Sequence, residues 1–357
     1  MTPETPMQKL FYVLIASLII FRVLSINYDY PQGKQIRIRG RVLSDPVSYE
    51  TARYIKINGL RAYIDLFPEV VYGDYIVLEG EVDGDRLRNA KVTEVAEGGG
   101  LYEVRQRIIN NFRSALPEPH AALVSGIVLG SKAHMPGEFW EKLKLTGTAH
   151  VVVASGMNVT FVTSFLLNSL VHFINRRKAI FIALSGAWVY VVLSGFDAPL
   201  VRAAIMGSIA FGAQGLGRIN IAIKALFGSA ALMLIAMPEW IYDLGFILSF
   251  VATLSLILFE SKVSKLLQKI PFFFKKDLAT TIAAQIGVAP ILFITFGNFN
   301  LFSPIINSLI LFTIPPIMII GAVAALVGLL LPFLGQLVVM LALPFTYWFV
   351  GVVNLFS

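Results

Sequence analysis

The sequence predicts a mainly α-helical, polytopic membrane protein that carries a small β-rich module outside the membrane. Of its 357 residues, 56% are hydrophobic and only 14% are charged, whereas charged residues make up about a quarter of ordinary soluble domains. The charged residues are also unevenly spread, because residues 34–97 hold many of them and long stretches after residue 149 hold one or none. The chain therefore divides into a water-facing segment and a lipid-facing segment.

The first apolar segment covers residues 10–24 and follows Lys9. It resembles the core of a signal peptide, but no small-residue cleavage pattern follows it and Arg22 lies near its end. We therefore predict that residues 1–27 form a retained anchor helix.

Residues 34–97 are predicted to form about five short strands. Apolar and polar residues alternate over 36–39, 54–57 and, more loosely, 75–82, and glycine-containing turns separate these runs. This pattern suits a small barrel of the OB type, a fold often used to bind single-stranded nucleic acid. The module contains ten Lys and Arg against eleven Asp and Glu, so it lacks a net basic charge. A spacer or docking role is the alternative to DNA contact.

A glycine-rich joint at residues 98–100 precedes a predicted amphipathic helix over 101–117, which Pro117 and Pro119 end. Apolar residues recur on one face of this helix and arginines lie elsewhere on it. The apolar residues are Leu101, Val104, Ile108, Phe112 and Leu116, and the arginines are Arg105, Arg107 and Arg113. We expect this helix to lie at the membrane surface.

Residues 118–357 are predicted to form a polytopic helical domain. Residues 121–129 are apolar but too short to cross a bilayer, so we expect them to be re-entrant or buried. The longer candidate spans are 149–174, 179–193, 199–216, 222–237, 241–259, 280–296, 302–330 and 334–356. Prolines 304, 315, 316 and 344 predict breaks in the last two, and broken helices are tolerated only against protein or a water-filled cavity.

The basic residues predict the orientation of the domain. Three basic clusters, at residues 176–178, 218–224 and 262–276, are each separated by two candidate spans. They therefore lie on one side, which the positive-inside rule makes cytoplasmic, and the strand module then lies outside. The formal net charge of +7 fits this orientation, although a polyanionic partner would also fit it.

Polar residues within the apolar stretches are functional candidates by default, because burying them in a bilayer is costly. Interhelical hydrogen bonds or interfacial positions are the alternative for each of them. The candidates are His150, Ser155, Asn158, Arg202, Asp243, Gln285, Asn298 and Asn307.

His150 and Asn158 are eight residues apart and would share one face of an unbroken helix. Gly156, between them, would let a backbone or a substrate approach closely. Arg202 could pair with Asp197, bind a phosphate through two donors or anchor its helix at the headgroups. It is the first choice for a phosphate contact.

Motifs for other chemistry are absent from the sequence. It contains no cysteine, and its four histidines lie 14 to 22 residues apart without a metal-binding pattern. It also lacks a phosphate-binding loop for ATP, a nuclease motif and a nucleophile elbow. We therefore predict no metal, no cofactor and no enzymatic activity for this chain.

Several short motifs occur in a fixed order between about residues 101 and 316. They are ALVSG at 122–126 with Gly130, HVVVASGMNV at 150–159, APLVRAAIM at 198–206, DLGFILSFVAT at 243–253, AQIGVAP at 284–290 and SPIIN at 303–307. Together they resemble the ComEC competence protein family, and the strand module resembles the OB-like domain of its members.

The resemblance implies passage of single-stranded DNA across the bacterial cytoplasmic membrane during natural transformation. It also implies a DNA receptor outside and a motor in the cytoplasm. Two departures are notable: many members have His where this chain has Asn158, and many continue into a metallo-β-lactamase-like domain, whereas this sequence stops at Ser357. Any nuclease would then be a separate polypeptide or be dispensable. A secondary transporter of a small solute and a non-transporting scaffold are the alternatives.

Overall fold

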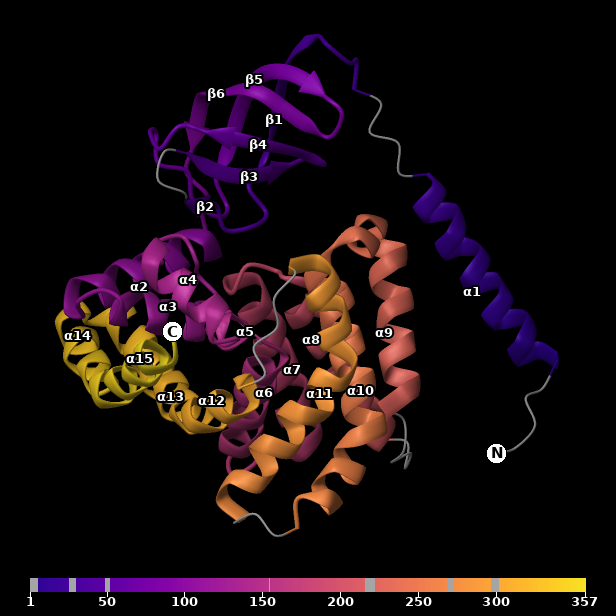
Figure 1. The fold of residues 1–357 in the computed structure, drawn as a ribbon, viewed down its shortest axis with the longest axis vertical. Helices are drawn as coiled ribbons and strands as arrows, with labels where there is room; N and C mark the ends of the chain where they lie inside the picture. Colours follow the sequence, from indigo (N-terminus) through magenta and orange to yellow (C-terminus); the bar gives the residue numbers. More distant parts are fainter. Residues whose placement is uncertain are drawn as a thin grey trace.

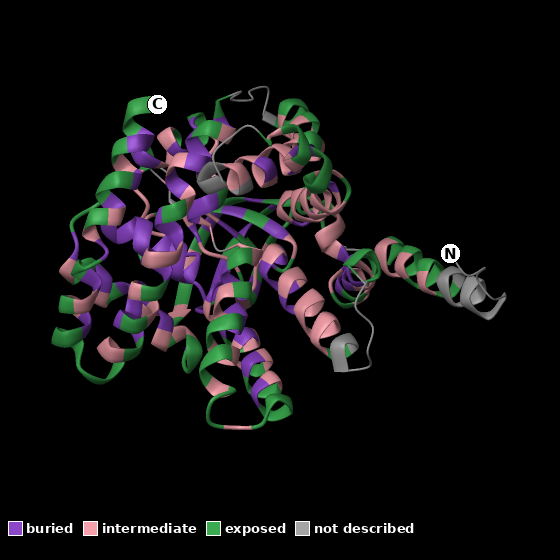
Figure 2. Ribbon diagram, turned by 90° about the horizontal axis from the view of Figure 1, so that it is seen from below, coloured by how far each residue is buried: buried purple, intermediate pink, exposed green. Residues whose placement is uncertain are grey.

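The computed structural model describes residues 6–25, 30–48, 52–153, 155–215, 222–268, 272–296 and 302–357. A strand module lies at one end of a helical domain, and the N-terminal helix α1 runs along one side (Figure 1). Helix α1 (Pro6–Leu24) contacts α9 (Ala222–Ala236), and the Arg22 Nε donates to the Ile235 carbonyl at 3.0 Å. Seen from below, α1 projects from the rest of the protein (Figure 2).

The strand module is a single six-stranded sheet with the order β1-β5-β6-β4-β3-β2. The pairs are antiparallel except β4–β6, which is parallel. The two residues of the β3–β4 turn, Asn58 and Gly59, have φ values of 46° and 84°, as a tight hairpin requires. The strands are β1 (Gln35–Arg41), β2 (Val47–Ser48), β3 (Arg53–Ile57), β4 (Leu60–Ile64), β5 (Tyr75–Asp83) and β6 (Arg86–Ala96).

The helical domain begins at α2 and continues to the C-terminus. Its first half contains α2 (Leu101–Ala115), α3 (His120–Leu129), α4 (Gly137–Leu145), α5 (Ala149–Val152), α6 (Gly156–Leu170), α7 (Arg176–Leu193) and α8 (Ala198–Gly215). After α9 come η1 (Pro238–Tyr242), α10 (Leu244–Leu266), α11 (Phe272–Phe296), α12 (Ser303–Ile310), η2 (Leu311–Thr313), α13 (Ile314–Leu330), α14 (Pro332–Met340) and α15 (Leu343–Phe356).

Among the described residues, four helical segments are long and apolar enough to cross a membrane: Ala149–Leu170, Leu244–Leu266, Asp277–Thr295 and Ser303–Leu330. Helices α14 and α15 together are a further candidate and are bent by 50° where Pro344 predicts a break. The protein is therefore a mainly α-helical membrane protein with a small N-terminal sheet.

Helix α3 is short and buried, in agreement with its sequence. All ten of its residues are buried, and it packs against α2, α13 and α15. Gly321 of α13 lies so close to α3 that a side chain there would overlap the Val128 side chain. The close packing places the end of α3 where water cannot reach its backbone carbonyls.

The last four carbonyls of α3 are each satisfied by a different donor. The N–H of Gly130, which has a left-handed φ of 69°, donates to Gly126 at 2.8 Å. Side chains of α6, α7 and α2 donate to the next three carbonyls. They are Asn158 to Ile127 at 2.8 Å, Tyr190 to Val128 at 3.0 Å and Arg105 to Leu129 at 3.2 Å. These are the carbonyls that an α-helix leaves without a partner.

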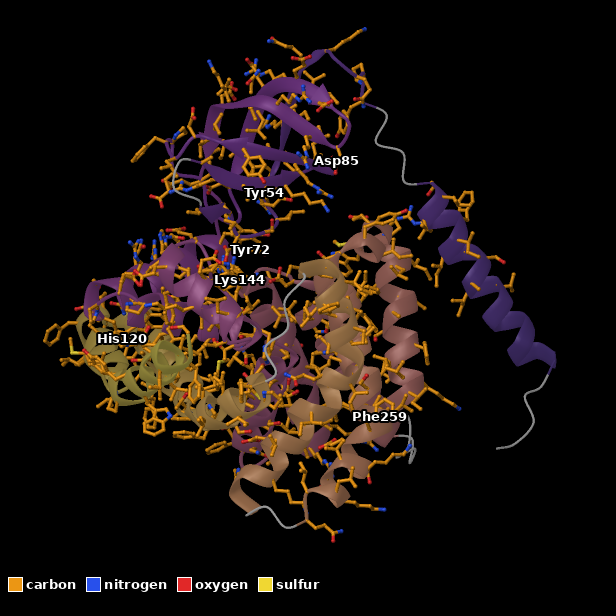
Figure 3. All side chains as sticks on the ribbon, in the orientation of Figure 1. Tyr54, Tyr72, Asp85, His120, Lys144 and Phe259 are labelled. Atoms are coloured by element: carbon orange, nitrogen blue, oxygen red, sulfur yellow. The ribbon has the colours of Figure 1, made fainter. Side chains whose placement is uncertain are left out.

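Arg105 also joins the helical domain to the strand module. Its Nη1 and Nη2 donate to the two carboxylate oxygens of Asp45 at 2.7 and 2.8 Å, and the Lys132 backbone N–H donates to the same carboxylate. The Tyr72 ring lies against the Arg105 guanidinium, and its hydroxyl donates to the Val192 carbonyl. Tyr72 lies where the strand module meets the helical domain (Figure 3). Arg105, on the predicted amphipathic helix, is thus buried in an ion pair with a carboxylate that lies 60 residues earlier in the chain.

Asp45→Ala is expected to destabilise the docked module, because it leaves the buried Arg105 charge uncompensated. Breaking a buried ion pair in this way costs about 3–5 kcal/mol. The thermal unfolding midpoint of the purified protein in detergent measures the loss. Glu94→Ala removes an exposed partner of Arg37 and serves as the control, with an expected cost of about 1 kcal/mol or less.

The effect of Asp45→Ala should be the same at pH 7 and pH 5. Burial alone would raise the pKa of Asp45, but Arg105 and the Lys132 N–H hold it below its ordinary value of 3.8. A carboxylate with a lowered folded-state pKa contributes fully above its ordinary value and loses that contribution only as the pH falls further. An effect that shrank by pH 5 would contradict this assignment.

Candidate functional site

The helix that contains His150 is interrupted before Asn158. Helix α5 ends at Val152, and α6 begins at Gly156 after the extended residues Val153 and Ser155. The prediction that His150 and Asn158 share one face of an unbroken helix is therefore wrong. Ser155 takes the extended conformation that is usual for a residue preceding a helix. Asn158 donates to a carbonyl at the end of α3, and a new helix, α6, therefore begins at Gly156.

Asn158 has a structural partner. Its side chain is 1% exposed, and its amide donates to the Ile127 carbonyl of α3. The Ser155 hydroxyl lies 3.4 Å from the Asn158 side-chain oxygen. For Asn158, the alternative of an interhelical hydrogen bond is what the structure contains.

Arg202 on α8 is held by neutral hydroxyl groups of α10. Its Nε donates to the Ser249 hydroxyl at 2.8 Å, and its Nη1 donates to the Thr253 hydroxyl at 2.6 Å. Within the described part of the chain, Arg202 forms no salt bridge. Of the three alternatives for Arg202, pairing with Asp197 is not what the structure contains, because that carboxylate lies 4.0 Å from the Lys132 ammonium instead. The guanidinium charge is thus positioned but not neutralised.

The remaining guanidinium nitrogen of Arg202 faces the start of α6. A side chain at Gly156 would lie 3.0 Å from the Arg202 Nη2 and 3.1 Å from the Ala203 side chain. Only glycine allows this approach without displacement. The backbone N–H groups at a helix N-terminus carry a partial positive charge, so two positive groups meet here.

Besides Arg202 and its hydroxyl partners, a second group of polar side chains lies near Gly147, on the other side of the interruption. It consists of Ser303 and Asn307. Gly147 has a φ of 70°, and a side chain there would overlap the Ser303 hydroxyl. Asn307 is fully buried and donates to the Ser303 hydroxyl at 3.1 Å, while its own side-chain oxygen has no hydrogen-bond partner among the residues that the structure describes. His150 is exposed.

The other predicted residues lie apart from these two groups. Asp243 caps α10 by accepting a hydrogen bond from the Phe246 N–H at 2.7 Å. This cap explains why α10 begins at Leu244 rather than at residue 241. Gln285 is half-buried on α11. Asn298 lies outside the described residues.

Sequence reasoning missed the two hydroxyl residues that hold Arg202. Ser249 and Thr253 are four residues apart on α10, so they lie on one face of that helix. Two hydroxyls at this spacing in an otherwise apolar segment were a detectable signal. Their partner on α8 could not be read from the sequence, because it lies 47 and 51 residues away.

Most of the helical domain matches a known protein family. Residues 127–357 match the family described as Competence protein. The chain belongs to the ComEC competence protein family. It is similar to ComE operon protein 3 of Bacillus subtilis (strain 168), with 28% identity over 211 residues that make up 58% of this chain and 26% of the relative. The match thus spans about a quarter of that relative's length, and no solved structure matches the chain.

In this ComEC-family chain, the Arg202 group and the Ser303–Asn307 group both lie within the family match. The interruption between α5 and α6 lies within it too. Asp45 and Arg105, which join the strand module to the helical domain, lie before it. The features that hold Arg202 therefore belong to the part of the chain that carries the family resemblance.

Asn158→Leu is expected to destabilise the protein by about 1–3 kcal/mol, the cost of a buried polar group left without a partner. Leucine has nearly the same shape but cannot donate to the Ile127 carbonyl. The shift in the thermal unfolding midpoint in detergent measures the effect. Asn168→Leu changes an exposed asparagine on the same helix and should have little effect. Equal shifts for the two variants would show that Asn158 does not cap α3.

Proposed function

We propose that this chain moves single-stranded DNA across the bacterial cytoplasmic membrane during natural transformation. We further propose that Arg202 and the start of α6 contact the phosphate backbone of the strand as it passes. Membership of the ComEC family supports the DNA substrate. The arrangement around Arg202 supports the role of this site.

The observation that carries the proposal is an arginine charge with neutral partners, which faces the N-terminus of an interrupted helix. Each of the two groups is positive, so they repel each other unless an anion lies near both. Discontinuous membrane helices commonly direct such N-termini at anionic substrate groups. A phosphate oxygen is an anion that a guanidinium binds well.

The phosphate chemistry also explains why the site need not bind tightly. A strand that passes through a membrane must bind well enough to enter and weakly enough to leave. One arginine held by Ser249 and Thr253 offers a single fixed contact rather than a deep charged pocket. Repeated release of successive phosphates is compatible with such a contact.

The domain organisation forms part of the proposal. Residues 1–27 form an anchor, 34–97 an OB-like module outside the membrane, 101–117 an interfacial helix and 118–357 the channel domain. The lone parallel pair β4–β6 supports the OB assignment, as do β1 and β2, which follow each other in sequence but lie at opposite ends of the strand order. The C-terminal end of α10, which carries Lys262 and Lys265, lies at the far end from the strand module (Figure 1), which supports the orientation.

The partners are proposed from the family resemblance and from chemistry that the sequence lacks. The sequence has no ATP-binding loop, so a separate cytoplasmic motor would drive movement. By the family resemblance, a DNA receptor outside would deliver the strand and a nuclease would degrade its complement.

Arg202→Ala is expected to reduce the uptake of labelled DNA into the cytoplasm at least about tenfold, because removal of one charge-assisted contact costs about 1.5–3 kcal/mol. The assay compares cells that lack the gene with cells complemented by the wild type or by a variant, at matched membrane expression. Arg202→Lys should give intermediate uptake, because lysine keeps the charge but loses the fixed two-hydroxyl geometry.

Arg113→Ala is the matched control, since it removes an equal charge that is half-exposed on α2 and paired with Glu118. It should leave uptake unchanged. Wild-type uptake by the Arg202→Ala strain would remove Arg202 from the path. Unchanged uptake after deletion of the whole gene would contradict DNA passage itself and favour a solute transporter or a scaffold.

A further inference from the structure

We propose that an exposed patch on the strand module binds single-stranded nucleic acid by base stacking and phosphate contact. The patch, called the outer patch below, is formed by Tyr54, Lys56, Arg61, Tyr63 and Arg86 on strands β3, β4 and β6. It is separate from the Arg202 site. The identity of its ligand as incoming DNA rests on the proposed function, whereas binding by the patch can be measured by itself.

The register of the sheet brings these five residues together. Tyr54 pairs directly with Tyr63, Lys56 pairs with Arg61, and Arg61 pairs with Arg86. Side chains alternate between the two faces of a strand. The residues between them point into the core of the module and are almost completely buried: Ile55, Ile57, Leu60, Ala62, Ile64 and Leu87. The outer patch is therefore the water-facing side of a rigid, well-packed sheet.

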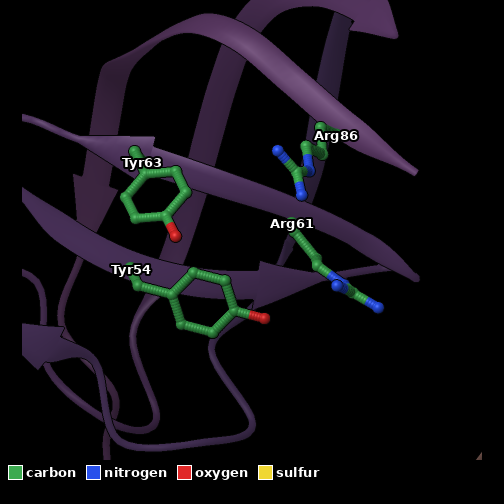
Figure 4. A pocket seen from close by; sticks show the side chains of 4 residues that line it. All are labelled: Tyr54, Arg61, Tyr63 and Arg86. Atoms are coloured by element: carbon green, nitrogen blue, oxygen red, sulfur yellow. The ribbon is translucent and has the colours of Figure 1, made fainter. Parts of the chain in front are cut away.

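The aromatic part of the patch is a pair of tyrosines, of which Tyr63 is exposed and Tyr54 is half-buried. The ring centroids of Tyr54 and Tyr63 are 5.5 Å apart, with planes inclined by 58°, and Tyr63 is 54% exposed. With Arg61 and Arg86 they line a shallow hollow of about 250 Å³ (Figure 4). This hollow is smaller than the about 300–1,000 Å³ of usual small-molecule pockets. It suits a flat ring laid against the tyrosines.

The charged part of the patch is a row of three cations at adjacent register positions. Like charges directly opposite each other destabilise a sheet. In the described residues, the row has one acidic partner, Asp85, which lies 3.1 Å from Arg61. Arg37, an exposed cation on β1, differs because it contacts both Glu79 and Glu94. The row thus retains positive charge that an anionic ligand would neutralise.

The clustering is local, because the module as a whole has ten basic and eleven acidic residues. Exposed aromatic rings beside cations on one face are the usual means of binding single strands without sequence preference, since bases stack on the rings and phosphates meet the cations. A folded acidic partner would need the cations but not the two tyrosines. A ligand that contacts both the tyrosine pair and the row of cations must carry flat rings as well as phosphates.

The experiment measures binding of a fluorescent oligothymidine of about ten nucleotides to the full-length protein in detergent. All variants carry Arg202→Ala, so that the proposed site within the helical domain does not contribute. Tyr63→Ala should weaken oligothymidine binding about tenfold, the size expected for one lost stacked base. It should leave binding of an abasic deoxyribose-phosphate strand of equal length almost unchanged.

Arg86→Ala should weaken binding of both strands. It should also reduce the slope of log affinity against log salt by about 0.7, as expected for one lost phosphate contact with a single strand. Phe67→Ala and Arg37→Ala are the matched controls, because Phe67 is 84% exposed and Arg37 is an exposed cation outside the patch. Both controls should bind both strands as the parent protein does.

Two results would overturn the proposed role of the outer patch. One is no oligothymidine binding by the parent protein, which carries Arg202→Ala alone. The other is oligothymidine binding that Tyr63→Ala and Arg86→Ala leave unchanged. Equal loss of the thymidine and abasic strands in Tyr63→Ala would overturn the stacking contact. None of these results depends on the uptake assay. Failure of the outer patch and failure of the proposed role of Arg202 are therefore separate outcomes.

Discussion

The buried C-terminus of α3 is the constraint on which the rest of the structure depends. An α-helix leaves its last four carbonyls without partners, and at this depth no water can replace them. Gly130, Asn158, Tyr190 and Arg105 satisfy one carbonyl each. Three of these donors come from α6, α7 and α2, so their hydrogen bonds fix three helices around α3. Through the pair of Arg105 with Asp45, the same requirement also fixes the strand module.

This constraint explains how the Arg202 site forms. Because Asn158 must reach the end of α3, α6 has to start close by, and its N-terminus with Gly156 then faces the guanidinium on α8. Ser249 and Thr253 position that guanidinium without neutralising it. The fold therefore creates a cationic contact from two elements that would repel each other in the absence of an anion. The outer patch would offer a strand an earlier contact, on a module that the Arg105–Asp45 pair joins to the helical domain.

The sequence predicted local features well and long-range pairings poorly. The apolar stretches, the Asn58–Gly59 turn and the short buried segment at 121–129 follow from composition and periodicity, which neighbouring residues determine. The interruption before Gly156 was not predicted, since its cause is a carbonyl of α3 that lies 31 residues from Asn158. Arg105 was expected on a polar face, but it is buried against Asp45. The partners of Arg202, Ser249 and Thr253, were not among the alternatives for the same reason. Such partners meet only in the folded chain.

The central claim is that single-stranded DNA passes the interruption between α5 and α6, and site-specific photo-crosslinking tests it most directly. A photoreactive amino acid replaces Met157, which is 41% exposed beside Gly156, or Leu326, which is 65% exposed on α13. Each protein is irradiated in cells during the uptake of labelled DNA. The account predicts a protein–DNA adduct at position 157 and none at position 326. Equal labelling at the two positions, or no adduct at 157 while uptake proceeds, would contradict it.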